Sequence, residues 1–223
     1  MTVNTELPLF LANSHVLFQG DSITEGGRWI DSDDLNHDIG QGYPYLIAAR
    51  HGAYLPNANV RFTNRGISGN TTIDLAARWK VDTLDLKPDV LSILVGINDV
   101  GRVSVDDYAA TYERLIAGAR QALPQVGIVL GEPFTLPVGA KQGNWDEWRL
   151  VVQSYQDVAA DLATRYRLPY VRYQQAFDEA CNRAPAEHWT WDGVHPTYAG
   201  HQLMADTWIA SFNRRAEITR ETL

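Results

Sequence analysis

Five short apolar runs recur along the chain, and longer stretches of mixed polarity separate them. The runs are rich in β-branched and aromatic residues, and most of them end in glycine or in a polar cluster, which is typical of strands. They cover residues 15–20, 60–66, 89–96, 126–134 and 168–174. The pattern therefore predicts five strands.

The stretches between these runs carry apolar residues at the spacing of one helical face. At the start of the third stretch, Ser104 and Asp107 have the spacing of a capping box, in which a serine and an acidic side chain satisfy the first N–H groups of a helix. The predicted helices cover residues 43–55, 71–86, 104–123, 144–167 and 196–212.

Alternation of strands and helices is typical of a parallel sheet that is covered on both faces. Right-handed crossovers then produce an α/β fold, a three-layer α/β/α sandwich around a five-stranded parallel sheet. No repeat or linker interrupts the pattern, so we expect one domain over residues 1–223. The longest irregular stretch, residues 26–42, is rich in acidic and polar side chains, and loops of that length are usually functional or mobile.

Composition excludes several classes of partner. The formal net charge is −8 and no run of Lys or Arg stands out, so nucleic acid and anionic membranes are poor partners. Cys181 is the only cysteine, which excludes an internal disulfide and a C-x-x-C metal site. The N-terminus lacks a basic start, and Pro8 and Asn13 interrupt its apolar stretch, so we expect no secretory signal and a cytoplasmic protein.

The polar residues that follow the predicted strands are the candidates for chemistry, because ligands of open α/β sheets bind at the carboxyl ends of the strands. Ser22 follows the first strand, the sequence GISGN (66–70) the second and GIND (96–99) the third, while WDGVHP (191–196) precedes the last helix. Phosphate-binding loops, dinucleotide fingerprints, the H-E-x-x-H zinc motif and the G-x-S-x-G elbow are absent. We therefore expect no cofactor and no metal.

These residues are of the types that acyl transfer requires. Asp192 stands three positions before His195, so its carboxylate can hold the imidazole as a base, and such a base activates a serine such as Ser22. The backbone N–H groups of Ser22 and Gly69 and the side-chain amide of Asn98 could then form an oxyanion hole.

Each of these residues also has a structural interpretation. Ser22 could cap a helix, Asp192 could cap the last one, and Gly69 and Asn98 could simply form turns. Ser68 is a rival nucleophile. The histidines that compete with His195 are His15, His37, His51, His188 and His201.

The sequences GDSIT, GISGNT, GIND and DGVHP, in this order, resemble the four sequence blocks of the SGNH (GDSL-type) hydrolases. The resemblance spans residues 14–212 and implies a flavodoxin-like α/β/α hydrolase fold. It also implies Ser22 as nucleophile, His195 as base and Asp192 as its orienting partner. Gly69 and Asn98 complete the oxyanion hole with the Ser22 amide. Members of the family are often oligomeric, so the resemblance allows a homo-oligomer.

Within the family, residues 64–100 and the sequence WTWDGVHP look like the intracellular acetyl esterases that act on acetylated xylo-oligosaccharides. The segment 27–43 lacks the continuous apolar groove that a long acyl chain needs, which favours small acyl groups. We therefore expect a serine esterase that removes acetyl or other short acyl groups from a carbohydrate, such as an acetylated oligosaccharide, through an acyl-enzyme. Asp21 and Trp191, the neighbours of Ser22 and Asp192, are candidate substrate contacts.

Two other functions stay open at this point. One is a lysophospholipase, arylesterase or thioesterase that uses the same site residues. The other is a carbohydrate-binding protein without catalysis, in which Trp29, Trp189 and Trp191 stack on sugar rings.

Overall fold

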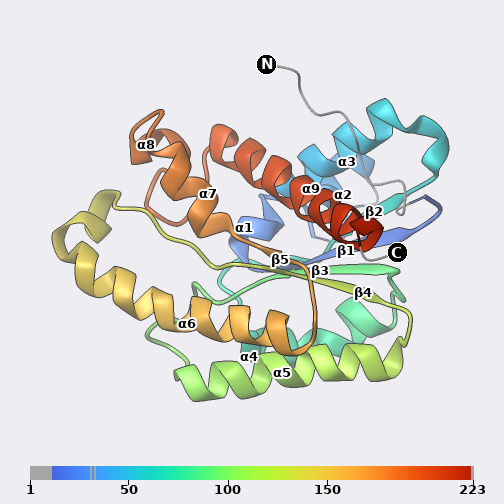
Figure 1. The fold of residues 1–223 in the computed structure, drawn as a ribbon, viewed down its shortest axis with the longest axis horizontal. Coiled ribbons are helices and arrows are strands. Elements are labelled where there is room, and N and C mark those ends of the chain that lie inside the picture. Colours follow the sequence, from blue (N-terminus) through green and yellow to red (C-terminus); the bar gives the residue numbers. More distant parts are fainter. Residues whose placement is uncertain (1–11, 31, 33, 222–223) are drawn as a thin grey trace.

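The computed structural model describes residues 12–30, 32 and 34–221, and Figure 1 shows that a central sheet divides them into layers. The strands are β1 (His15–Gly20), β2 (Arg61–Asn64), β3 (Val90–Leu94), β4 (Gly127–Gly131) and β5 (Tyr170–Val171). All neighbouring strands pair in parallel, in the order β2-β1-β3-β4-β5. The predicted α/β class and five-stranded parallel sheet are confirmed.

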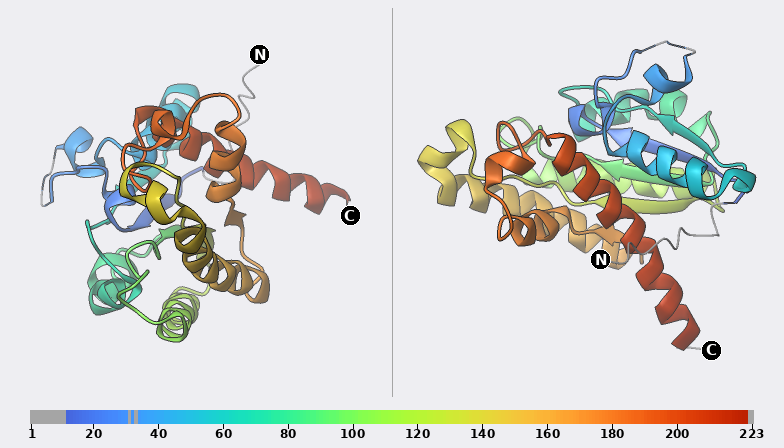
Figure 2. Two further views of the ribbon diagram at one scale, coloured as in Figure 1. Left: turned by 90° about the vertical axis from the view of Figure 1, so that its left-hand side faces the viewer. Right: turned by 90° about the horizontal axis from the view of Figure 1, so that it is seen from above.

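Helices cover both faces of this sheet. They are α1 (Ser22–Glu25), α2 (Leu35–Ile39), α3 (Tyr43–Tyr54), α4 (Thr72–Trp79), α5 (Val105–Ala122), α6 (Trp145–Arg165), α7 (Tyr173–Ala180), α8 (Ala186–Trp189) and α9 (Tyr198–Glu221). Figure 1 shows α4, α5 and α6 below the sheet and α3, α7 and α9 above it. Figure 2 shows that α9 extends away from the other elements at its C-terminal end.

Strand β1 shows why two layers of helices are needed. All six of its residues are buried, and successive side chains of a strand point to opposite faces of the sheet. Val16 and Phe18 belong to the apolar cluster that contains Trp208 of α9. Leu17 belongs to the other cluster, with Leu75 of α4. Because both faces of the strand are apolar, both must be covered.

The strand order changes direction at β1. The chain crosses from β1 to β2 on one side and then to β3 on the other, so the loops after β1 and β3 diverge. This is the switch point at which open α/β sheets bind ligands, and the order is that of flavodoxin-like sheets. The segments with the candidate residues Ser22, Gly69 and Asn98 follow the three strands that meet there.

The last predicted strand is much shorter than expected. β5 contains two residues, and α7 occupies the end of the apolar run that predicted a strand over 168–174. Tyr173, Gln174, Phe177 and Ala180 are buried in α7, at positions that share one helical face. The run therefore serves one short edge strand and one buried helix face.

The remaining differences concern helix boundaries. α4 starts with a capping box between Thr71 and Asp74, and after Trp79 the chain continues as a π-helix, Lys80–Leu84. At α5, Ser104 accepts a hydrogen bond from the N–H of Asp107, which is one half of the predicted capping box, whereas the Asp107 carboxylate accepts from the Ser104 hydroxyl. α9 begins at Tyr198, and the Thr197 hydroxyl accepts a hydrogen bond from the N–H of Gly200. Asp192 is therefore not its cap.

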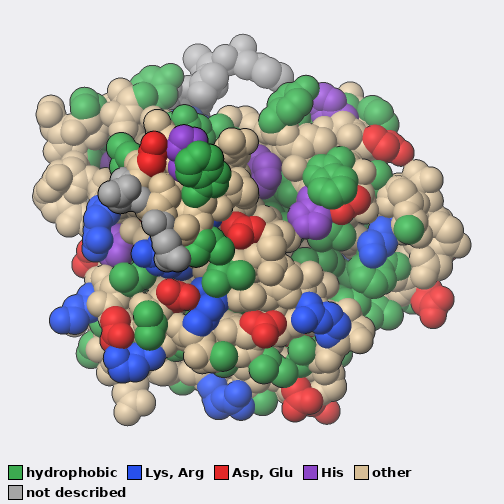
Figure 3. All heavy atoms as spheres, turned by 180° about the vertical axis from the view of Figure 1, so that it is seen from behind, with side chains coloured by type: hydrophobic (Ala, Val, Ile, Leu, Met, Phe, Trp, Pro, Cys, Tyr) green, Lys and Arg blue, Asp and Glu red, His purple; other side chains and the backbone are tan. Residues whose placement is uncertain are grey.

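The described residues contain no helix that is long and apolar enough to span a membrane, and no group of His, Cys, Asp and Glu that could hold a metal. On the face that Figure 3 shows, Lys and Arg side chains are interspersed with Asp and Glu. Residues 1–11, on which the expectation of no secretory signal partly rests, lie outside the described residues. Residues 31 and 33 of the segment 26–42 also lie outside them.

Candidate active site

The turn after β1 carries Ser22 as the first residue of α1. Asp21 caps this short helix, since its Oδ1 accepts a hydrogen bond from the N–H of Ile23 at 3.0 Å. The cap position is therefore filled by the residue before Ser22. The Ser22 hydroxyl is left for another partner.

That partner is His195, which is 173 positions away in the chain. Ser22 Oγ lies 2.8 Å from His195 Nε2, and His195 Nδ1 lies 2.7 Å from Asp192 Oδ2. The carboxylate accepts a hydrogen bond from Nδ1–H, which leaves the lone pair of Nε2 free to accept the proton of the serine hydroxyl. The three side chains therefore form one continuous line of hydrogen bonds.

Asp192 is held as an anion by its own loop. Burial acts to raise the pKa of this carboxyl, but the hydrogen bonds from His195 and from the N–H of Val194 outweigh it, and the pKa is lowered. Asp192 Oδ1 accepts from the N–H groups of Val194 and His195 at 2.9 and 2.7 Å. The carboxylate thus shapes the loop and orients the imidazole.

The loop with Asp192 and His195 is anchored at Gly193. The carbonyl of Gly193 accepts hydrogen bonds from the N–H of Leu136 and from the Thr135 hydroxyl, in the segment that follows β4. Gly193 has φ +90°, and a Cβ there would lie 2.6 Å from the carbonyl oxygen of Leu136. Glycine is therefore required at this position both by backbone conformation and by packing.

The ring of Trp191 lies beside that of His195. Its ring stacks on that of His195 at a centroid distance of 5.1 Å and an angle of 15°. The side chain is 64% exposed, so it does not pack into the core. Trp191 therefore lies exposed beside His195, and its role as a substrate contact stays a prediction.

The predicted oxyanion donors follow β1, β2 and β3. Gly69 is exposed and has φ +78°, and its carbonyl accepts from Arg102 Nη1 at 2.8 Å. Asn98 Nδ2 donates to the carbonyl of Asn70 at 3.2 Å, which leaves the second proton of that amide for a ligand. Among the hydrogen bonds of the described residues, none is donated by the N–H of Ser22 or of Gly69. These N–H groups are available to an oxyanion.

Asp21 does not fit the prediction that it contacts substrate. Its side chain is 1% exposed, because it points into the protein beneath α1 to cap that helix. Burial raises the pKa of this carboxyl to about 7. A substrate that reaches Ser22 from solvent would not reach Asp21.

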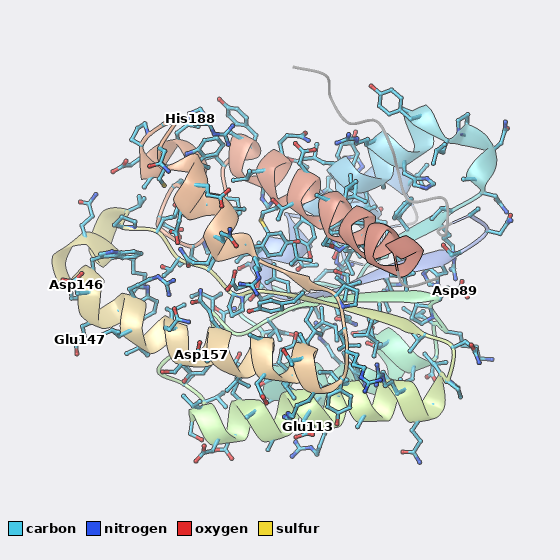
Figure 4. The ribbon with its side chains drawn as sticks, viewed as in Figure 1. Asp89, Glu113, Asp146, Glu147, Asp157 and His188 are labelled. Carbon is cyan, nitrogen blue, oxygen red and sulfur yellow. The ribbon has the colours of Figure 1, made fainter. Side chains whose placement is uncertain are left out.

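The rival histidines lie elsewhere. His188 is exposed on α8, at the outer edge of the molecule in Figure 4. His201 is partly buried, its Nδ1 accepts from the N–H of Tyr43 at 3.2 Å, and burial lowers its pKa to about 4. His195 is the histidine that hydrogen-bonds to Ser22. Ser68, the rival nucleophile, donates its hydroxyl to Glu25 instead.

Comparison with known proteins shows the family of the chain. The model of the GDSL-like lipase/acylhydrolase family matches residues 18–203. The acetylxylan esterase of Geobacillus stearothermophilus is 34% identical over 207 residues, which cover 87% of this chain and 91% of that protein. The chain belongs to the GDSL-like lipase/acylhydrolase family. It is accordingly a carboxylic ester hydrolase, and the resemblance seen in its sequence blocks is confirmed.

Solved structures of this GDSL family have the same fold. A protein from Parabacteroides merdae described as a GDSL-like lipase is 36% identical, with a TM-score of 0.85 over 89% of this chain and 95% of that chain. The Geobacillus esterase superposes with a TM-score of 0.79 over 89% and 93% of the two chains. Its catalytic variants replace a serine, an aspartate and a histidine, the last two three positions apart. A further variant replaces the tryptophan before that aspartate.

Sequence reasoning missed two polar residues that bind the GDSL-type loops together. Asp99 is fully buried, and its carboxylate accepts from the N–H and the hydroxyl of Thr72, which joins the loop after β3 to the start of α4. Arg78 of α4 donates hydrogen bonds to Gly20 at the end of β1 and to Asn70 in the loop after β2. Asp99 belongs to the GIND block, but the sequence assigns a role only to Asn98 of that block. For Arg78, the sequence shows only a charged residue on a half-apolar helix, which does not indicate its hydrogen-bond partners.

Proposed function

We propose that the protein is a serine esterase that removes acetyl or other short acyl groups, with Ser22 as nucleophile, His195 as base and Asp192 as its orienting residue. The observation that carries the proposal is the hydrogen-bonded line from Ser22 Oγ through the imidazole to the Asp192 carboxylate, with steps of 2.8 and 2.7 Å. The equivalent types of residue, at the same aspartate-to-histidine spacing, are those replaced in the catalytic variants of the Geobacillus esterase.

The reaction then proceeds in two acyl transfers. Ser22 Oγ attacks the ester carbonyl while His195 Nε2 accepts its proton, and the N–H groups of Ser22 and Gly69 with the Asn98 amide bind the developing oxyanion. The C–O bond to the alcohol breaks, and the leaving alkoxide takes the proton from His195. Water next attacks the acyl-enzyme with His195 again as base, which releases the acid and restores Ser22.

The substrate we propose is a small acetyl ester on a carbohydrate. Support comes from the similarity to an acetylxylan esterase and from Trp191, whose exposed ring stacks on the base. A broad aromatic face is suited to a sugar ring, while its bulk beside the triad shortens the space for the acyl chain. Among the described residues of the segment 26–42, polar side chains predominate, which disfavours a groove for a long acyl chain.

Covalent labelling tests the nucleophile. A p-nitrophenyl organophosphonate should attach to one site per molecule, and peptide mass spectrometry should find it on Ser22. The Ser68→Ala variant is the matched control, because Ser68 is the rival nucleophile and should not affect labelling. Attachment at another serine, or no attachment to a folded protein, would refute the mechanism.

A substrate panel tests the acyl and alcohol preference. Turnover should fall steeply from p-nitrophenyl acetate to the octanoate, and acetylated xylo-oligosaccharides should release acetate. Octanoate turned over as well as acetate would move the assignment to a lysophospholipase or thioesterase.

The cytoplasmic location, the single-domain organisation and a homo-oligomeric state stay predictions from the sequence.

A further inference from the structure

Arg78 makes hydrogen bonds to three separate segments around the candidate active site. Its side chain is 15% exposed. Nη2 donates to the carbonyl of Gly20 at 3.2 Å, Nε donates to Asn70 Oδ1 at 2.8 Å, and Nη1 donates to the carbonyl of Arg65 at 2.7 Å. One planar guanidinium group thus joins the end of β1 to both ends of the loop after β2.

The partners of Arg78 are neighbours of the oxyanion donors. Gly20 is one residue before Asp21, and the next peptide unit carries the N–H of Ser22. Asn70 directly follows Gly69, whose N–H is the second oxyanion donor. The carbonyl of Asn70 accepts a hydrogen bond at 3.2 Å from Asn98 Nδ2, the third oxyanion donor. Asn70 therefore connects Arg78 to Gly69 along the backbone and to Asn98 through a hydrogen bond.

We propose that Arg78 is a positioning residue of the esterase, which sets the spacing between the N–H of Ser22, the N–H of Gly69 and the amide of Asn98. The proposal rests on the proposed function of these groups as an oxyanion hole. Donors of this kind act only when they are aligned in advance, and a displacement of about 1 Å costs about 10²-fold in rate. Arg78 does not touch the reacting atoms.

The geometry requires arginine and not only a positive charge. Guanidinium presents five N–H donors in a rigid plane, whereas the lysine ammonium is a single point on a flexible stem. A lysine at this position cannot bridge Gly20, Arg65 and Asn70 together. Arg78 also forms an ion pair with Asp82 at 3.1 Å, one turn along the helix, and this contact involves none of the oxyanion segments.

The test compares Arg78→Met and Arg78→Lys with the wild type on p-nitrophenyl acetate, well below the unfolding temperature of each variant. We expect kcat to fall about 10²-fold in both variants while KM changes little, because alignment matters in the transition state and not in the ground state. Inhibition by a small alkylboronic acid, which becomes tetrahedral on a serine, should weaken in parallel with the loss of kcat/KM.

Two variants serve as controls that should leave activity unchanged. Asp82→Asn removes the ion pair of Arg78 but keeps its other contacts. Arg165→Met removes an arginine that pairs with Glu113 and Asp161 on α5 and α6. If Arg78→Met fails to fold, Asn70→Ala removes the single contact with Nε, and kcat should fall about tenfold, a fraction of the cost of one lost oxyanion donor.

The outcomes separate this inference from the proposed function. A wild-type enzyme that is not labelled at Ser22 by the phosphonate refutes the serine mechanism itself. A wild-type enzyme that is labelled, together with full kcat in the Arg78 variants or in Asn70→Ala, refutes the positioning role alone. Activity restored by Arg78→Lys would also refute it, since charge would then suffice.

Discussion

The turn that carries Ser22 and the loop that carries Asp192 and His195 are built in different ways. Around Ser22, the residues Asp21, Ile23 and Thr24 are all at most 1% exposed. The side chains of His195 and Asp192 are 35% and 33% exposed, and the adjacent Trp191 is largely in solvent. The two regions meet through one hydrogen bond, from Ser22 to His195.

The difference concerns what holds each group in position. The turn is fixed by packing, since a Cβ at Gly20 would collide with the carbonyl of Leu94 and one at Gly66 with the backbone of Glu25. The loop is fixed by directed hydrogen bonds that converge on Asp192 and Gly193. We therefore expect larger side chains at Gly20 or Gly66 to affect folding first, and substitutions in the loop to affect activity first.

The largest effect should come from Ser22→Ala. Turnover should fall about 10⁶-fold, because the covalent pathway is lost, while stability should change by only about 1 kcal/mol for one hydrogen bond. Steady-state kinetics with p-nitrophenyl acetate and thermal unfolding would be measured on the same preparation. A folded variant that retains a tenth of the wild-type activity would show that the turn does not carry the nucleophile.

His195→Ala should lower turnover as much as Ser22→Ala does, by about 10⁶-fold, because the nucleophile and the base act together and the loss of either one disables both. His188→Ala is the control, since His188 lies in the same segment but on the exposed surface of α8. It should leave turnover near the wild-type value. The assignment of the base is wrong if the two variants show the reverse pattern.

Asp192→Asn should have a smaller effect, of about 10⁴-fold in kcat, because the imidazole loses its correct tautomer but the nucleophile and base are still present. Asp206→Asn is the matched control, because the Asp206 carboxylate is exposed and contacts Arg50 and Gln202 but neither Ser22 nor His195. A loss equal to that of Ser22→Ala would instead mean that the whole loop has lost its structure, which crystallography or NMR of the variant would show.

The smallest effect concerns stability and pH. The folded pKa of His201 is lowered from 6.5 to about 4, so the unfolded chain binds this proton more readily. Neutral His201 therefore contributes about 3 kcal/mol to the free energy of unfolding above pH 6.5, and this contribution is lost as the pH falls towards 4. Asp21, whose pKa is raised to about 7, acts in the opposite direction, since its protonation stabilises the fold as the pH falls.

His201→Asn isolates the first contribution. The asparagine Oδ1 can accept from the N–H of Tyr43 in place of the imidazole, and the Asp21 contribution is common to both proteins. Urea unfolding at a series of pH values should show a flatter acid limb for the variant. Equal limbs for the variant and the wild type would mean that His201 is readily protonated in the folded protein.

Local sequence was enough for much of the fold. The apolar run at 15–20 coincides with β1, and the predicted helices at 43–55 and 104–123 differ from α3 and α5 by one residue at most at each end. Periodicity is a local property that follows directly from which side of an element is buried. The spacing of Asp192 and His195 is local too, and the hydrogen bond between them fits within one loop.

The last run, 168–174, is a case in which periodicity failed. Apolar and aromatic residues there suit both a strand and a buried helix face, and the run divides between β5 and α7. Only the packing of α7 against α9 and the sheet determines where the strand ends.

Tertiary structure alone decided how the candidate site is assembled. Whether the Ser22 hydroxyl caps a helix or meets an imidazole depends on His195, 173 positions away, and on Asp21 as the actual cap. The burial of Asp21 and the reach of Arg78 to Gly20 are likewise set by elements that are remote in sequence. A residue's type shows which bonds it is able to make, but its partners are determined only when the chain packs, because burial and hydrogen-bond geometry depend on distance in space.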